Sequence, residues 1–217
     1  MTILEPTAQP AETHGVSQIL RYWLGDALDQ PSGWPSAPAI EQSWFQGGPA
    51  VDAEITARFG PLVQQALSGG LPCWEVKPLP RLALLLLLDQ FTRNVFRGQP
   101  QAFMGDTRAQ SLVLASLQQD PDTLQALPLA GQLFWGMPLM HAEDVTLQER
   151  SVAYFETLAA HTPQAQQERV ARSVAAAKEH RDIVARFGRF PHRNAVLGRT
   201  STPEEMAFLK NGPRFGQ

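Results

Sequence analysis

Apolar residues recur at helical spacing over most of the chain. Ile19, Leu20, Trp23 and Leu24 form the first such stripe, which predicts a helix from Val16 to about Leu28. Similar stripes predict further helices over 51–67, 80–97, 102–117, 144–160, 163–187 and from Ser201 onward, with a short one after Pro121. No segment alternates convincingly with the period of two that marks a half-buried strand. The pattern therefore predicts an all-α fold.

The spacing of apolar residues alone does not assign a secondary structure to two segments. Pro80 to Arg97 is the most apolar stretch and could be a buried strand by hydrophobicity alone. Its leucines and alanines favour a helix, and valine or isoleucine, which a buried strand prefers, is absent before Val95. We predict a central helix here. In the segment 131–140, by contrast, Trp135, Gly136 and Pro138 favour a turn.

The predicted helices number about 8–10, and short connections separate them. This arrangement is typical of a bundle or of a stack of helical hairpins. A repeat near 34 residues would mark a tetratricopeptide array, but no clean repeat of that length is present. We expect a disordered tail over residues 1–15, because this stretch has no apolar period, and a single all-α domain over 16–217.

Composition narrows the functional classes. The formal net charge of −3 argues against a general binder of nucleic acids or acidic membranes. Cys73 is the one cysteine, which excludes an internal disulfide and fits a reducing compartment. The opening residues lack the basic-then-apolar pattern of a signal peptide, and the apolar run Leu82 to Leu88 is far shorter than the about 20 residues of a membrane span. We therefore expect a soluble cytoplasmic protein that contacts neither nucleic acid nor membrane.

The stretch from Lys178 to Arg199 is rich in basic residues. It holds six of the eighteen basic residues, against two acids, Glu179 and Asp182. It is predicted to be the end of a helix that stops at Gly188, followed by a loop rich in proline and arginine. Like charges at this density repel one another, so specific contacts must hold the loop. Guanidinium groups match the geometry of carboxylates and phosphates, which makes this loop a candidate anion site.

The central helix carries charges of its own. Asp89, Arg93 and Arg97 are spaced four residues apart and form one stripe, with Gln90 beside it. Asp89 follows the leucine run directly, so an unpaired carboxylate there would cost several kcal/mol. Arg93 is the cation nearest to Asp89 in sequence, and we expect an arginine of the loop, Arg189 or Arg193, as its distant partner. A structural ion pair is the favoured interpretation for Asp89, and an anion site is the alternative.

Histidines supply the other candidates for chemistry. His180 lies on the apolar face of its predicted helix, where a histidine is most often a hydrogen-bonded core residue. His141 and Glu143 could form an acid–base pair or bind a metal, although acidic residues also suit a helix start. The chain has no His-Glu-x-x-His or Cys-x-x-Cys spacing, so no metal site is predicted. Cys73 is interpreted as a packed thiol.

Several motifs resemble a known family. These are Leu84 to Gly98 (LLLLLDQFTRNVFRG), Met140 to Asp144, Gln148 to Ser151 and His180 to Arg199. They resemble the bacterial domain-of-unknown-function family 924 over nearly the whole chain. The resemblance implies a single all-α, tetratricopeptide-like domain and no particular activity. The family pattern usually has proline where Thr92 stands, and a more aromatic segment where Gly136 and Met137 stand.

Three functions remain open from the sequence. The first is a helical protein with a polar, Arg-rich pocket for a small anionic ligand. Its predicted binding residues are Gln90, Arg93, Asn94, His180, Arg189, Arg193, Asn194 and Arg199. We expect the Arg193 guanidinium to face a pocket open to solvent, with Asn94 or Asn194 beside it.

The second function is a hydrolase that uses His141, Glu143 or Asp89, with or without a divalent metal. The third is a tetratricopeptide-like scaffold that binds a peptide in a groove. The sequence identifies neither a cofactor nor an oligomeric state.

Overall fold

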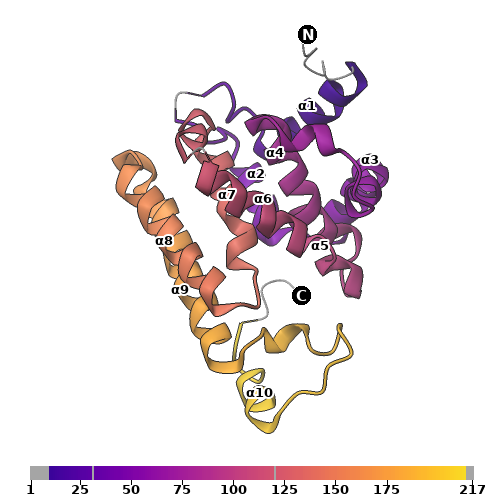
Figure 1. Cartoon of the computed structure of the whole chain (residues 1–217), viewed down its shortest axis with the longest axis vertical. Coiled ribbons are helices and arrows are strands. Elements are labelled where there is room, and N and C mark those ends of the chain that lie inside the picture. Colours follow the sequence, from indigo (N-terminus) through magenta and orange to yellow (C-terminus); the bar gives the residue numbers. More distant parts are fainter. Residues whose placement is uncertain (1–9, 31, 120, 214–217) are drawn as a thin grey trace, which may run out of the picture.

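The computed structural model describes residues 10–30, 32–119 and 121–213, and these form helices joined by turns and loops, with no strand among them (Figure 1). The α-helices are α1 (Pro10–Leu24), α2 (Pro38–Gln46), α3 (Pro49–Leu67), α4 (Pro78–Leu85), α5 (Thr92–Val95), α6 (Asp106–Gln119), α7 (Leu129–Met140), α8 (Val145–His161), α9 (Gln167–Phe187) and α10 (Pro203–Phe208). Short 3₁₀ turns lie at 72–75, 100–103, 121–126, 164–166 and 191–193. The predicted all-α class is confirmed.

Several helix ends are capped by side-chain or backbone groups. The carboxylate of Asp144 accepts a hydrogen bond from the Leu147 amide at 2.9 Å, and so caps α8. Thr202 and Glu205 form a reciprocal capping box at the start of α10. At the other end of α9, Gly188 takes a φ of 70°, a left-handed conformation that glycine adopts without steric cost. The arginine-rich loop therefore begins where the sequence predicts.

The predicted central helix is present but not uniform. After α4, residues Leu86–Phe91 form a π-helix, and α5 follows without a break. Thr92, in place of the proline usual in the family pattern, lets the chain stay helical, and its hydroxyl donates to the Leu88 carbonyl at 2.9 Å. A π-helical turn inserts an extra residue into the ladder, a feature often found at functional sites. Asp89 lies within this turn.

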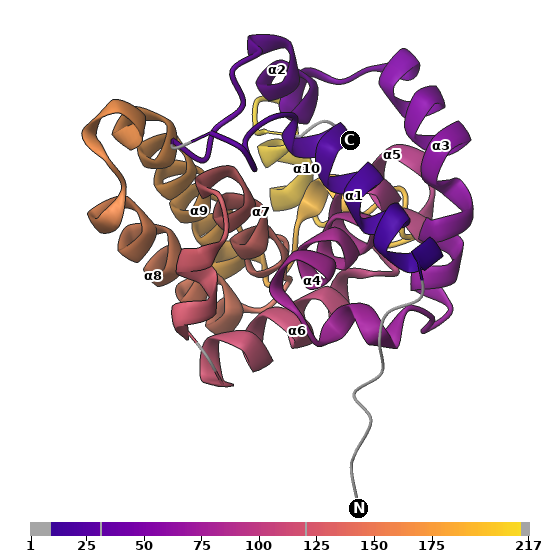
Figure 2. The same cartoon turned by 90° about the horizontal axis from the view of Figure 1, so that it is seen from above.

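The helices pack around this central segment. α4 contacts α1, α7 and the π-helix, while α8 and α9 form a long antiparallel hairpin against α7 (Figures 1 and 2). The largest fully buried side chains include Trp74, Trp135, Phe59, Phe91 and Phe155. A separate small cluster, Ile183, Val184 and Phe190 with Phe187 and Phe208, joins the end of α9 to α10. The chain thus has one main core and a satellite cluster near the arginine-rich loop.

Two local predictions differ from the structure. The first helix begins at Pro10, so residues 10–15 of the expected tail are helical, and residues 1–9 lie outside the described part. The segment 131–140 belongs to helix α7 instead of forming a turn, with Pro138 inside it. Within the described ranges, no helix is long and apolar enough to cross a membrane. The single-domain and tetratricopeptide-like expectations stay predictions.

Candidate functional site

A cavity of about 590 Å³ lies between the amino-terminal helices, α7, α9 and the loop after α9. Its apolar wall consists of Trp23, Trp34, Trp44, Phe45, Phe103, Leu133, Met137, Met140 and Ala176. Its polar wall includes Gln90, Asn94, Ser173, Glu41, Glu179, three histidines and five arginines. The volume is within the range of about 300–1,000 Å³ that ligand pockets occupy.

The cations of this wall outnumber its anions. Arg93, Arg97, Arg169, Arg172 and Arg193 line the cavity. Most of the carboxylates that pair with these arginines, at positions 52, 89, 106 and 168, do not line it. Glu41 is the exception, because it lines the cavity and also pairs with Arg169 at 3.1 Å. Guanidinium groups therefore outnumber carboxylates on the cavity wall, five to two.

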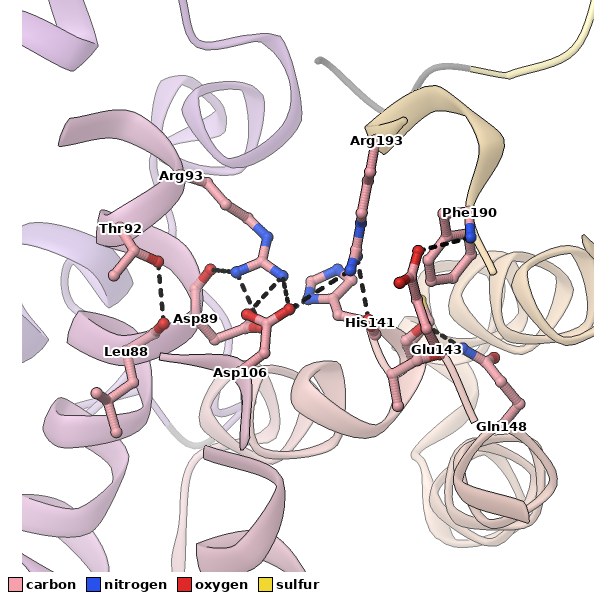
Figure 3. A network of polar contacts seen from close by, with 12 residues as sticks. Leu88, Asp89, Thr92, Arg93, Asp106, His141, Glu143, Gln148, Phe190 and Arg193 are labelled. Atoms are coloured by element: carbon pink, nitrogen blue, oxygen red, sulfur yellow. Dashed lines mark hydrogen bonds and ion pairs between the residues drawn. The ribbon is translucent and has the colours of Figure 1, made fainter. Parts of the chain in front are cut away.

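Asp89 is at the centre of the buried network behind this wall (Figure 3). The residue is 1% exposed, and its carboxylate lies 3.3 Å from Arg93 and 2.7 Å from His141 Nδ1. The side-chain amide of Gln90 donates a hydrogen bond to the same carboxylate at 2.5 Å. Burial alone would raise the pKa of this carboxyl, but Arg93 and His141 outweigh it and the pKa is lowered. Asp89 is therefore ionised, and His141 Nδ1 must carry the proton of their hydrogen bond.

The expected pairing of Asp89 with a loop arginine is wrong. Its arginine is Arg93, one helical turn along the same segment. The loop arginine that comes nearest, Arg193, reaches Asp106 instead, at 3.5 Å. Asp106 also contacts Arg93 at 3.0 Å, so two guanidinium groups share this carboxylate. Burial, opposed by Arg93, raises the pKa of Asp106.

Arg193 lines the cavity, as expected, although it is only 6% exposed. Its guanidinium lies between the rings of Phe103 and Phe190, 4.6 and 4.5 Å from their centroids. Nη2 donates to the His141 carbonyl at 3.0 Å, while Nε has no hydrogen-bond partner among the described residues. Burial and the neighbouring charge of Arg93 lower the pKa of Arg193 to about 10. Asn94 also lines the cavity, whereas Asn194 does not.

His180 and His192 line the cavity as neutral rings. Burial lowers the pKa of His180 to about 3, and burial together with the charge of Arg193 lowers that of His192 to about 3. His180 Nδ1 donates to the Ala176 carbonyl at 2.8 Å, because a carbonyl can only accept. The interpretation of His180 as a buried, hydrogen-bonded histidine is confirmed. Its ring centroid is 6.2 Å from that of His141.

The other predicted binding residues of the loop do not line the cavity. Arg189 pairs with Glu205 at 2.7 Å, and Arg199 pairs with Glu143 at 2.6 Å. Asn194 donates to Ser201 at 3.0 Å and to Glu205 at 3.2 Å. Glu205 belongs to α10, Ser201 lies just before α10, and Glu143 lies just before α8; folding brings these segments against the loop. Arg189 and Arg199 therefore form ion pairs with carboxylates of the protein, as expected for arginines that hold the loop in place.

His141 and Glu143, which the sequence allows as an acid–base pair, have different hydrogen-bond partners. Glu143 accepts hydrogen bonds from the Phe190 amide at 2.7 Å and from Arg199, while His141 faces Asp89. Burial would raise the pKa of Glu143, but Arg199 and the Phe190 amide lower it. Among the described residues, no group of three or more His, Cys, Asp or Glu could hold a metal ion. His141 and Glu143 thus take part in different networks.

The sequence interpretation missed several residues of this site. No motif includes Asp106, Arg169 or Arg172, and Trp34 lies in a proline-rich segment without an apolar period. His192 lies in the basic stretch but is not among the predicted binding residues. Arg169 and Arg172 belong to α9, one turn apart, and resemble an ordinary charged helix face. Only the three-dimensional approach of α9 to Trp34, with Arg169 5.3 Å from its ring centroid, shows that they contribute to a wall.

Comparisons with known proteins agree with the resemblance seen in the sequence. A solved structure of a protein of unknown function from Agrobacterium tumefaciens is 32% identical and superimposes with a TM-score of 0.74, over 92% of this chain and 99% of that one. No curated protein matches the chain significantly. Residues 19–213 match the family described as bacterial proteins of unknown function, DUF924. The chain belongs to this DUF924 family.

Proposed function

We propose that the protein binds a small anionic molecule in the cavity beside Arg93 and Arg193. The observation that carries this proposal is the arrangement of charge. Five arginines and two glutamates line a cavity of about 590 Å³, and most acidic partners of the arginines do not line it. An anion in the cavity meets guanidinium groups first, and these match carboxylate and phosphate oxygens.

Arg193 is the residue on which binding depends most. Its carboxylate contact, at 3.5 Å to Asp106, is long, and Asp106 is shared with Arg93. The Nε–H of this buried guanidinium donates no hydrogen bond to a described residue. An unmade hydrogen bond at a buried donor costs about 1–3 kcal/mol, so the protein's own acceptors do not saturate this guanidinium.

The nearby amides have a supporting role. Gln90 donates to Asp89, and Asn94 donates to Asp52 at 2.8 Å. Both side chains therefore fix the acids that orient Arg93 and Arg97, since Asp52 also pairs with Arg97 at 2.6 Å. The apolar wall suits a ligand whose charged end meets the arginines and whose remainder packs against tryptophan and methionine side chains.

Isothermal titration and thermal unfolding with succinate and inorganic phosphate test this function. An anion at a hundred times its dissociation constant stabilises the folded state by about 2.7 kcal/mol, which raises the melting temperature by about 5–10 °C. We expect Arg193→Met to weaken binding at least about tenfold, because the thioether keeps the apolar contact with both phenyl rings and removes the charge.

The matched control is Arg186→Ala. This arginine belongs to the same basic stretch, is exposed and pairs with Glu204 at 2.8 Å, away from the cavity wall. It is expected to leave anion binding unchanged. Circular dichroism checks that both variants keep the helical content. The proposal is wrong if neither anion binds the parent protein, or if Arg193→Met binds as tightly as the parent does.

A further inference from the structure

We propose that Asp89 and His141 form a catalytic dyad, in which His141 is the general base that activates water to hydrolyse a small anionic ester. This inference rests on the proposed function, because the cavity must first bind the anionic substrate. It adds an activity to that function and assigns the roles of the two residues.

The geometry of the pair carries the inference. His141 ends α7, and its Nδ1 donates to the buried carboxylate of Asp89 at 2.7 Å. The hydrogen bond fixes the ring and places the proton on Nδ1, so Nε2 carries the lone pair. Nε2 has no hydrogen-bond partner among the described residues, and the side chain is 17% exposed and lines the cavity. A basic nitrogen is thus held at the wall of the binding site.

The surroundings of Asp89 explain why it orients His141 instead of taking its proton. Arg93 at 3.3 Å and the Gln90 amide at 2.5 Å stabilise the ionised carboxylate. A buried carboxylate with these partners stays charged while the imidazole becomes protonated, and it then stabilises the imidazolium. Asp89 is therefore a positioning residue, and His141 is the group that touches the reacting water.

The same wall supplies a group for the negative charge that hydrolysis creates. Arg193 donates to the His141 carbonyl at 3.0 Å, so its guanidinium lies beside the histidine, and Arg93 shares Asp106 with it. Guanidinium groups near a carbonyl oxygen stabilise the oxyanion of a tetrahedral intermediate. The network places a base and an electrophilic group around one space, as acyl hydrolysis requires.

The proposed step balances with water as the only co-reactant. Nε2 of His141 accepts a proton from water as the water oxygen bonds to the ester carbonyl carbon, and the carbonyl oxygen takes the negative charge beside the arginine. When the C–O bond to the alcohol breaks, the imidazolium returns the proton to the leaving oxygen. The products are a carboxylic acid and an alcohol, and the histidine regains its starting state.

Two chromogenic esters with the same scissile bond test the activity. p-Nitrophenyl hemisuccinate carries a free carboxylate and p-nitrophenyl acetate carries none. We expect the parent protein to hydrolyse the hemisuccinate with a kcat/KM at least about tenfold above that for the acetate. His141→Gln should lower kcat by about 100-fold or more, the range that general-base catalysis supplies, while succinate binding stays within about threefold.

The control is His161→Gln, which removes an exposed histidine at the end of α8, away from the cavity. It should keep the parent rate. A parent protein that binds succinate but hydrolyses neither ester overturns the dyad and leaves the proposed binding function intact. Failure to bind succinate or phosphate contradicts the binding function itself. An undiminished rate in His141→Gln also overturns the dyad.

The positioning role of Asp89 has its own spectroscopic readout. Nitrogen-15 NMR of the histidine side chains should show His141 with its proton on Nδ1 in the parent protein. In Asp89→Asn the amide can donate, so a mixture of the two tautomers is expected, together with a lower kcat and a nearly unchanged KM. An unaltered tautomer with an unaltered kcat would show that Asp89 has only a structural role.

Discussion

Arg193 and Arg199 lie in the same loop, yet their guanidinium groups have different surroundings. Arg199 forms a two-pronged contact with Glu143. Arg193 lies between two phenyl rings and has one distant carboxylate, which it shares with Arg93. A guanidinium neutralised by a dedicated carboxylate has a structural role, whereas one that shares its counter-charge keeps electrostatic capacity for a ligand. The partner, more than the residue type, decides the role.

The buried histidine His180 makes stability depend on pH. Its pKa is lowered from 6.5 to about 3, chiefly by burial, so the unfolded chain binds a proton more readily than the folded protein does. The free energy of unfolding should therefore rise with pH across this range. Between pH 5 and 7.5 we expect a contribution of about 2 kcal/mol from this histidine. His192, whose pKa is lowered in the same direction, should add to the slope.

Urea unfolding of His180→Phe at several pH values measures this contribution. In the parent protein the free energy of unfolding should increase from pH 5 to pH 7.5. In His180→Phe this increase should be smaller by about 2 kcal/mol, whatever the stability of the variant at neutral pH. His161→Phe, at an exposed position on α8, should keep the parent slope. Above pH 5 most carboxylates stay ionised in both states, so they contribute little to the comparison. Equal slopes in the parent and in His180→Phe would contradict the assignment.

For single residues, the sequence predicts ion pairs between neighbours in the chain well and ion pairs between distant residues poorly. The spacing of Asp89 and Arg93 places them one turn apart, and the expected stripe is a real contact. Arg97, on the same stripe, instead pairs with Asp52 of α3, because α5 packs against that helix. The contacts of Arg199 with Glu143 and of Arg193 with Asp106 link residues far apart in the chain. No local period indicates such contacts.

Helix α7 shows how an element can escape detection by periodicity. Nearly all of its residues are buried, including Gly136 and Pro138, so the sequence has no polar face to mark a helix. Gly136 favours a turn in isolation, but here it lets the helix approach α8. A Cβ atom at this position would lie 2.4 Å from the Tyr154 ring. By contrast, α3 and α8 have both polar and apolar faces, and their predicted spans agree with the structure to within a few residues.

Substituting this glycine tests the close approach of α7 and α8. Gly136→Ala should lower the free energy of unfolding by about 1–3 kcal/mol, because the added methyl group overpacks the contact with Tyr154. Gly60→Ala in α3 is the matched control, since an added Cβ, apart from its chain neighbours and the nearby backbone of its own helix, meets nothing closer than Thr56 Cγ2 at 4.0 Å. It should raise the free energy of unfolding by about 0.5–1 kcal/mol through helix propensity. Two changes of the same sign in urea unfolding would contradict this explanation.

At the scale of the whole molecule, the cavity joins parts that are remote in the chain. Its wall runs from Trp23 in α1 to Arg193 after α9. The sequence predicts the separate segments, including the central helix and the basic loop, but not the space that they enclose. That space exists because the α8–α9 hairpin packs against α7 (Figure 1) and carries the loop to a position where Arg193 contacts Phe103 and Asp106. The aromatic wall from α1 and α2 could not be assigned to a site without this packing.

The part of the chain after α9 is attached to the main core largely by polar contacts. The satellite cluster of Phe187, Phe190 and Phe208 with two residues of α9 is separate from the main core. Glu143, just before α8, accepts hydrogen bonds from the Phe190 amide and from the Arg199 guanidinium. The His141 carbonyl accepts a hydrogen bond from the Arg193 guanidinium. These contacts set the position of Arg193 at the cavity wall. The geometry of the site therefore depends on a carboxylate that does not line it.

Glu143→Ala should loosen this attachment without unfolding the main core. Loss of charged hydrogen bonds that are partly buried costs about 1.5–3 kcal/mol, so amide hydrogen exchange over 188–201 should speed up by about 10–100-fold, while α4 keeps its protection. Glu204→Ala removes an exposed partner of Arg186 and should change exchange little. Succinate affinity should also fall in Glu143→Ala, because Arg193 is carried by the loosened segment. Equal exchange in the two variants would mean that the apolar contacts of Phe190, and not Glu143, hold the loop against the cavity.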